Sequence, residues 1–99
     1  MKSEVFNYSI TKEDLFENIL TDENLMLNHV VIEPGKVFPK HPTDAMVYII
    51  IMQGKLYLTV EEEEEKVYQP GQVVHVKKGI ETILGNKGEE HTEVFVIKI

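Results

Sequence analysis

The chain lacks several residue types, and each absence excludes a class of protein. It has 99 residues and no cysteine, which excludes a disulfide framework, a thiolate zinc site and a thiol nucleophile. It also has no arginine: all ten basic residues are lysines, and against 17 acidic residues they leave a net charge of −7. Nucleic-acid binding favours a basic face and arginine forks, so we expect no nucleic-acid partner.

Long apolar runs are missing as well. No stretch approaches the roughly 18 apolar residues that a membrane span requires, so we expect no membrane partner. The first ten residues, MKSEVFNYSI, contain no apolar signal core, and this favours a cytoplasmic protein. With 42% apolar and 27% charged residues, the composition is that of one globular domain over residues 1–99.

The sequence contains a series of short strand signals separated by turn residues. The expected strands are residues 5–10, 18–20, 25–33, 46–52, 56–60, 67–68, 73–76, 82–84 and 94–99. Thr11 followed three residues later by Asp14 resembles a helix cap, so one short N-terminal helical turn is expected over residues 12–16. Many short strands with a turn every 8 to 12 residues predict an all-β sandwich or barrel.

The segment MVYIIIM, residues 46–52, indicates that the chain associates with another subunit. Its alternating positions are apolar on both faces of the strand, although a strand with one face in water should carry polar residues on that face. A barrel of this size has one interior, so the second face is expected to meet another subunit. The sequence therefore predicts a homodimer.

Two groups of glycines resemble the two motifs of the cupin family of small β-barrels. In the first motif, Gly35 is followed by five residues and His41, and then by Thr43, Val47 and Gly54. The family pattern at the last three positions is His, Glu and Gly, so only the glycine is retained.

The second motif repeats this agreement in spacing. Gly71 is followed by Lys77 in place of the family's proline, then by Gly79, Thr82 in place of histidine, and Asn86. The resemblance covers residues 35–86 and implies a cupin-like double-stranded β-helix, also called a jelly-roll barrel.

The same resemblance implies that the metal site is degenerate. Cupins that bind metal use two histidines, one glutamate and a third histidine, and of these this chain keeps His41. Valine at position 47 cannot ligate a metal, and the hydroxyls of Thr43 and Thr82 are poor ligands for first-row transition metals. We therefore expect no metal and no cofactor.

The expected site is a ligand pocket in the mouth of the barrel. It would be formed by His41, Thr43, Val47 and Thr82, with His29 added if His29 rather than Asn28 faces inward. The preferred function is a metal-free protein that binds a small, partly apolar molecule near His41.

Three alternatives remain open at this point. The first is a metal-free isomerase or epimerase with His41 as the base. The second is an oxygenase-type enzyme with a metal site rebuilt from His29, His41 and His75. The third is a dimeric interaction domain whose barrel is closed. Because one fold hosts many activities, the fold does not choose between them.

Overall fold

The computed structural model describes residues 2–99, and for His41 it describes the backbone alone. Its strands are β1 (Leu15–Thr21), β2 (Met26–Ile32), β3 (Val37–Pro42), β4 (Val47–Gln53), β5 (Leu56–Val60), β6 (Lys66–Tyr68), β7 (Val73–Val76), β8 (Glu81–Gly85) and β9 (Thr92–Lys98). The described residues form no helix that could cross a membrane.

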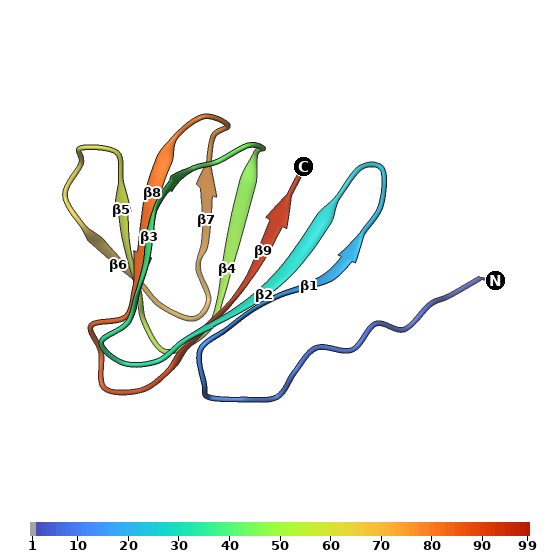
Figure 1. The fold of residues 1–99 in the computed structure, drawn as a ribbon, viewed down its shortest axis with the longest axis horizontal. Helices are drawn as coiled ribbons and strands as arrows, with labels where there is room; N and C mark the ends of the chain where they lie inside the picture. The colour runs from blue at the N-terminus through green and yellow to red at the C-terminus, as the bar shows by residue number, and fades with distance from the viewer. Residues whose placement is uncertain (1) are drawn as a thin grey trace.

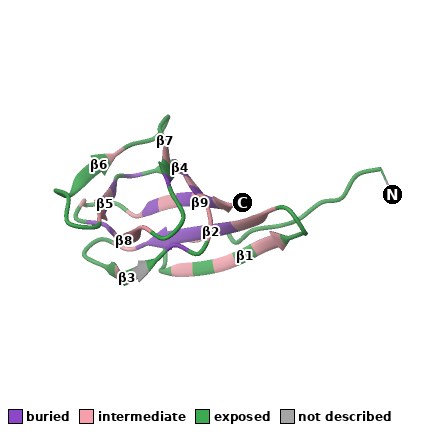
Figure 2. Ribbon diagram, turned by 90° about the horizontal axis from the view of Figure 1, so that it is seen from above, coloured by how far each residue is buried: buried purple, intermediate pink, exposed green. Residues whose placement is uncertain are grey.

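The strands form two antiparallel sheets that face each other (Figure 1). One has five strands in the order β1-β2-β9-β4-β7, and the other has four in the order β3-β8-β5-β6. The most buried strands, β2, β4 and β9, lie in the middle of the first sheet (Figure 2). The expected all-β architecture is confirmed.

The core lies between the sheets and is built from every second residue of the strands. In β4 the side chains of Val47, Ile49 and Ile51 point inward and are almost completely buried, while Tyr48 and Ile50 point outward. The core comprises Val30, Ile32, Val47, Ile49, Ile51, Leu56, Leu58, Val76, Leu84, Val94 and Val96. β-Branched residues suit such a two-layer core because they pack well on a pleated surface.

The buried Asn86 shows why the second motif ends in asparagine. Its side-chain amide donates to the carbonyls of Ile32 and Glu90 at 2.9 and 2.8 Å, and its oxygen accepts from the backbone N–H of Gly88 at 2.9 Å. One side chain therefore pairs three backbone groups where the β8–β9 loop meets the end of β2. Leaving such groups unpaired would be costly inside the protein.

Two expectations for the N-terminal region are wrong. Residues 2–14 form neither the strand expected at 5–10 nor the helical turn expected at 12–16. The Thr11 hydroxyl accepts from the N–H of Glu13, which closes a tight turn, and Asp14 then exchanges two hydrogen bonds with Glu33 at the end of β2. These contacts direct the chain into β1 instead of into a helix.

β3 is a strand that the sequence analysis did not predict. It carries two prolines, Pro39 and Pro42, and proline is depleted in strands because it cannot donate to the ladder. β3 lies at the edge of the four-stranded sheet and pairs with β8 alone, with an irregularity between Phe38 and His41. An edge strand tolerates prolines that a central strand would not.

Candidate ligand-binding site

A cavity of about 50 Å³ lies between the two sheets at one end of the barrel. It is lined by Phe16, Val30, Phe38, Thr43, Val47, Ile49, Val76, Thr82, Leu84, Val96 and Lys98. Three of the expected pocket residues, Thr43, Val47 and Thr82, are in this set. The lining comes from both sheets and is mostly apolar.

The strand register explains how these residues meet. Val47 is an inward residue of β4, and Thr82 is an inward residue of β8. The backbone of His41 in β3 pairs with Thr82, which places this residue next to the cavity wall. The His41 side chain, which the sequence analysis placed in the pocket, lies outside the described residues.

The two threonine hydroxyls differ in what they can offer a ligand. Thr43 Oγ1 lies 2.9 Å from the carbonyl oxygen of Lys77 and 3.1 Å from that of Ile80, so its proton is committed to the backbone. Within the part of the chain that the structure describes, the Thr82 hydroxyl forms no hydrogen bond. Thr82 lines the cavity, so its hydroxyl is a polar group of the lining that is not committed to the backbone.

Two aromatic rings lie where the edges of the two sheets meet. Phe16 from edge strand β1 and Phe38 from edge strand β3 have ring centroids 6.3 Å apart, and both line the cavity. Phe16 is 59% exposed, so its ring stands at the rim and not in the core. The cavity therefore has one lining side chain that also meets solvent at this rim.

The described side chains at the family's ligand positions do not suit a metal ion. Val47 has no donor atom, and the Thr43 hydroxyl is hydrogen-bonded to carbonyls. A first-row metal site needs three or more imidazole, thiolate or carboxylate ligands. Within the described residues, no group of three or more histidine, aspartate or glutamate side chains converges in a way that could hold a metal.

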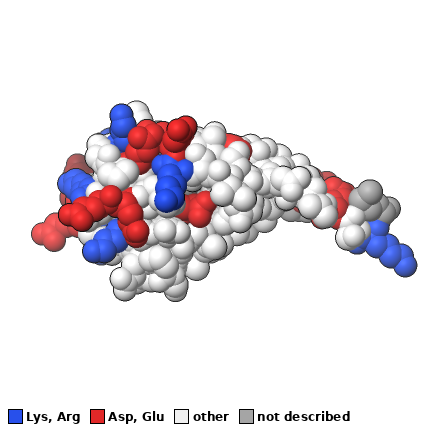
Figure 3. Space-filling model, turned by 90° about the horizontal axis from the view of Figure 1, so that it is seen from below, with Lys and Arg blue, Asp and Glu red and all other residues white. Residues whose placement is uncertain are grey.

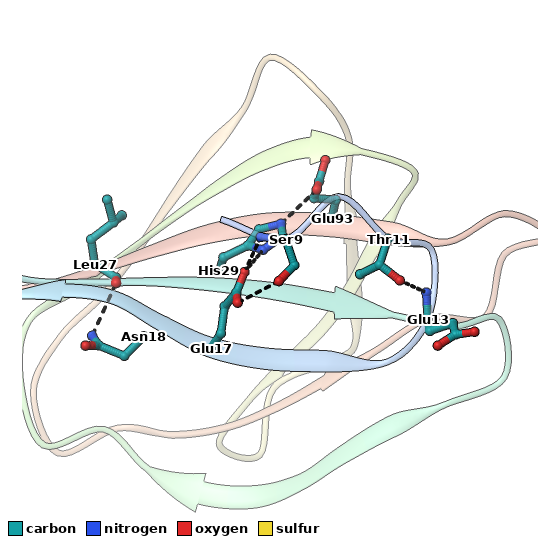
Figure 4. Close-up of polar contacts among 8 residues, drawn as sticks. All are labelled: Ser9, Thr11, Glu13, Glu17, Asn18, Leu27, His29 and Glu93. Carbon is teal, nitrogen blue, oxygen red and sulfur yellow. Dashed lines mark hydrogen bonds and ion pairs between the residues drawn. The ribbon is translucent and has the colours of Figure 1, made fainter. Parts of the chain in front are cut away.

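The structure places His29 away from the cavity, contrary to the expectation that it joins the pocket. The inward residue of β2 at this point is Asn28, whose backbone partner is the core residue Val96. His29 points to the outer face of the five-stranded sheet, where its side chain is completely buried (Figure 4). The register that puts Val30 and Ile32 into the core allows no other result, because neighbouring residues of a strand point to opposite faces.

His75 does not approach His29 either. It lies on the outer face of β7, where its ring stacks on Tyr48 of β4 with centroids 4.4 Å apart. β9 and β4 separate β7 from β2, so at about 4.8 Å per strand spacing the two histidines are about 14 Å apart or more. A metal site rebuilt from His29, His41 and His75 is therefore not formed.

His29 instead lies between two carboxylates that the sequence analysis did not identify. Its Nδ1 is 2.9 Å from Glu17 Oε1, and its Nε2 is 2.7 Å from Glu93 Oε2 (Figure 4). Each ring nitrogen therefore has a carboxylate oxygen as its hydrogen-bond partner. Alternation alone could not reveal this set, because Glu17, His29 and Glu93 meet only through the β1–β2–β9 register.

The same cluster holds the segment that precedes β1. The N–H and the hydroxyl of Ser9 donate to the two Glu17 oxygens at 2.7 and 2.9 Å. The Tyr8 ring lies over His29 and Phe95, with centroids 4.9 and 5.0 Å away. We call Glu17, His29 and Glu93 the His29 cluster.

This arrangement predicts an acid-sensitive N-terminal segment. The Ser9 N–H, and after it the His29 side chain, lower the pKa of Glu17 below its ordinary value of 4.5. A lowered folded-state pKa contributes stability that is present above the unfolded pKa and is lost as pH falls through the folded value. We expect the Ser9 amide resonance to move towards its unfolded shift below about pH 4.5. In Glu17→Gln this transition should be absent; an unchanged pH profile in that variant would contradict the assignment.

Comparisons with known proteins agree with this architecture. The family model of the cupin domain matches residues 28–98. The uncharacterized protein MJ0764 of Methanocaldococcus jannaschii is 31% identical over 87 residues, which cover 88% of this chain and 75% of that protein.

Solved structures give the same result. The crystal structure of the RmlC-like cupin MJ0764, which has a double-stranded β-helix fold, matches with a TM-score of 0.94 and 29% identity, covering 99% of this chain and 91% of that one. A cupin superfamily protein from Desulfitobacterium hafniense matches with a TM-score of 0.78 over 94% of this chain and 83% of its own, at 12% identity, which shows the fold alone. The expected double-stranded β-helix is confirmed.

Proposed function

The chain belongs to the cupin family, and we propose that it binds a small, largely apolar molecule in the mouth of its barrel, beside His41 and without a metal ion. The observation that carries the proposal is the apolar cavity between the sheets, in which the Thr82 hydroxyl is available to a ligand. Binding sites for small molecules are typically apolar, with a small number of polar groups that fix the ligand's orientation.

The size of the cavity restricts the ligand. At about 50 Å³ it has a third of the volume of an engineered apolar cavity of about 150 Å³ that binds benzene. We infer that a small apolar group, such as a branched alkyl end, enters the cavity and that the rest of the ligand lies at the rim, beside the Phe16 and Phe38 rings.

The chemistry of the lining favours binding over acid–base catalysis. The described lining residues include no carboxylate and no phenol, and Lys98 forms an ion pair with Asp44 at 3.5 Å. A base at His41 would therefore lack an orienting partner from this set, and an acid–base site needs one. The isomerase or epimerase alternative is thus less well supported than ligand binding.

Methyl NMR titration tests the proposal, with acetone, 2-propanol and isobutyrate as probes. We expect saturable shifts of the methyl signals of Val47, Ile49 and Leu84 for at least one probe. Val47→Ile puts an additional methylene into the cavity and should weaken that binding at least tenfold, which is about 1.4 kcal/mol. Thr82→Val should weaken binding by a similar factor, because it removes one hydrogen bond while keeping the shape.

Val67→Ile is the matched control, because Val67 lies on β6 and does not line the cavity. Absence of any saturable shift, or tight binding that survives Val47→Ile, would overturn the proposal. Such a result would favour the alternative of an interaction domain whose barrel is closed. Elemental mass spectrometry, on protein purified without chelator or affinity metal, tests the metal-free part. One transition ion per chain, lost in His41→Ala, would contradict the metal-free proposal and favour a metal-dependent enzyme.

A further inference from the structure

The cavity between the sheets has a lysine in its wall. Among the described lining residues, Lys98 is the one whose side chain carries a charge. Thr92, Val94 and Val96 are the inward residues of β9, and Lys98 continues this row at the end of the strand, beside the C-terminus (Figure 1). Its backbone partner in β4 is Val47, which also lines the cavity. The strand register therefore directs a lysine towards a space that is otherwise mostly apolar.

The acidic partner of Lys98 holds it weakly. Lys98 Nζ lies 3.5 Å from Asp44 Oδ1, whereas a charge-assisted hydrogen bond between such groups is about 2.7–2.9 Å long. The Asp44 side chain is 84% exposed and that of Lys98 is 26% exposed, so water already surrounds most of the carboxylate. An ion pair of this kind contributes little free energy. Lys98 can therefore exchange Asp44 for another anion at small cost.

The rest of the molecule does not favour anions. The chain has a net charge of −7, which repels small anions from a distance. Figure 3 shows the molecule from below, where the β2–β3, β4–β5 and β8–β9 loops lie in Figure 1, and acidic side chains are gathered there among the lysines. A preference of the cavity for an anion would therefore have to come from a local group, and Lys98 is placed to supply it.

The polar groups of the lining also indicate what the ligand must offer. The ammonium of Lys98 comes from the five-stranded sheet and only donates hydrogen bonds, and the hydroxyl of Thr82 comes from the four-stranded sheet and can donate as well. A carboxylate accepts hydrogen bonds through two oxygens, and its single negative charge matches the single ammonium. The remaining lining, mostly apolar, suits a short alkyl group.

We propose that the ligand of the cavity is a small branched-chain carboxylate, and that Lys98 determines this specificity. The Lys98 ammonium binds the carboxylate in place of Asp44, while the alkyl group of the ligand enters the apolar cavity. This inference rests on the proposed function, because it names the class of ligand for the same cavity. Attraction between the two charges is stronger beside an apolar wall than in open water, because the effective dielectric constant is lower there.

A pair of probes of the same shape tests the role of charge. Isobutyrate and isobutyramide share the branched alkyl group, and at neutral pH only isobutyrate is charged. In methyl NMR titrations of the wild type we expect isobutyrate to bind about tenfold more tightly than isobutyramide. Lys98→Met keeps most of the side-chain stem and removes the ammonium. It should abolish this preference by weakening isobutyrate binding about tenfold, with isobutyramide binding unchanged.

Two further variants control for the charge of the whole chain and for the role of Asp44. Lys66→Met removes the same charge from β6, which does not line the cavity, and should leave the preference unchanged. Asp44→Asn releases Lys98 from its ion pair and should tighten isobutyrate binding roughly threefold without affecting isobutyramide.

The outcomes separate this inference from the proposed function. Equal affinities for isobutyrate and isobutyramide, or a preference that survives Lys98→Met, would overturn the inference and leave the binding of an apolar ligand intact. A loss shared equally by both probes in Lys98→Met, or an equal loss of isobutyrate binding in Lys66→Met, would also overturn it. Absence of binding by both probes, and by acetone and 2-propanol, would overturn the proposed function as well. If Lys98→Met does not fold, the wild-type comparison and Asp44→Asn still decide the result.

Discussion

Gly54→Ala is expected to destabilise the fold by about 3 kcal/mol or more. Gly54 has a φ of +72°, and a Cβ atom there would overlap the backbone oxygen of His91 and lie 3.1 Å from the Cα of Thr92. A left-handed conformation alone costs a residue with a Cβ about 1–2 kcal/mol. The overlap adds to this because its partner is backbone, which cannot rotate away as a side chain can.

Gly35→Ala separates the two contributions. Gly35 has a similar φ of +84°, but a Cβ there would meet no atom within 4 Å. Its variant should lose only about 1–2 kcal/mol, which is the conformational cost. Urea unfolding followed by circular dichroism measures both variants, with equal m-values as the condition for comparing them. Equal decreases in the free energy of unfolding for Gly35→Ala and Gly54→Ala would show that the overlap with His91 does not affect stability.

This comparison also explains why the two glycines of the first motif could be used to recognise the fold. Gly35 and Gly54 stand at positive φ, which few other residues adopt, so their spacing reflects the backbone geometry directly. The strands from Leu56 to Val76 were predicted almost to the residue for a similar reason, since turn residues bound each of them. β3 was missed because its edge position, and with it the tolerance for Pro39 and Pro42, follows only from the assembled sheets.

The candidate site could be predicted only in part. The motif spacing brought Thr43, Val47 and Thr82 to one place, and these three residues do line the cavity. The volume of the cavity depends on how side chains from both sheets pack around it. The spacing of motif residues along the sequence carries no information about that packing. The position of His29 depended on which face of β2 is inward, and the alternation left this open because both faces are apolar around Asn28 and His29.

His29→Leu is expected to lower the free energy of unfolding by about 2 kcal/mol at neutral pH. The leucine fills the space of the ring but cannot donate, so Glu17 and Glu93 lose their shared partner at the edge of an apolar face. Breaking a fully buried ion pair costs about 3–5 kcal/mol. The cost is lower here because the carboxylate side chains remain 25% and 21% exposed and can recruit water.

Two controls distinguish the loss of charge pairing from the loss of packing. In the triple variant Glu17→Gln, His29→Leu, Glu93→Gln no charge is left without its partner, so much of the stability should return. The deficit of the single variant should also shrink as pH falls, because protonation of Glu17 removes an unpaired charge. A deficit independent of pH, and unrelieved in the triple variant, would show that His29 acts through packing against Tyr8 and Phe95 alone. Because Glu17 also holds Ser9, His29→Leu should also loosen the segment that precedes β1.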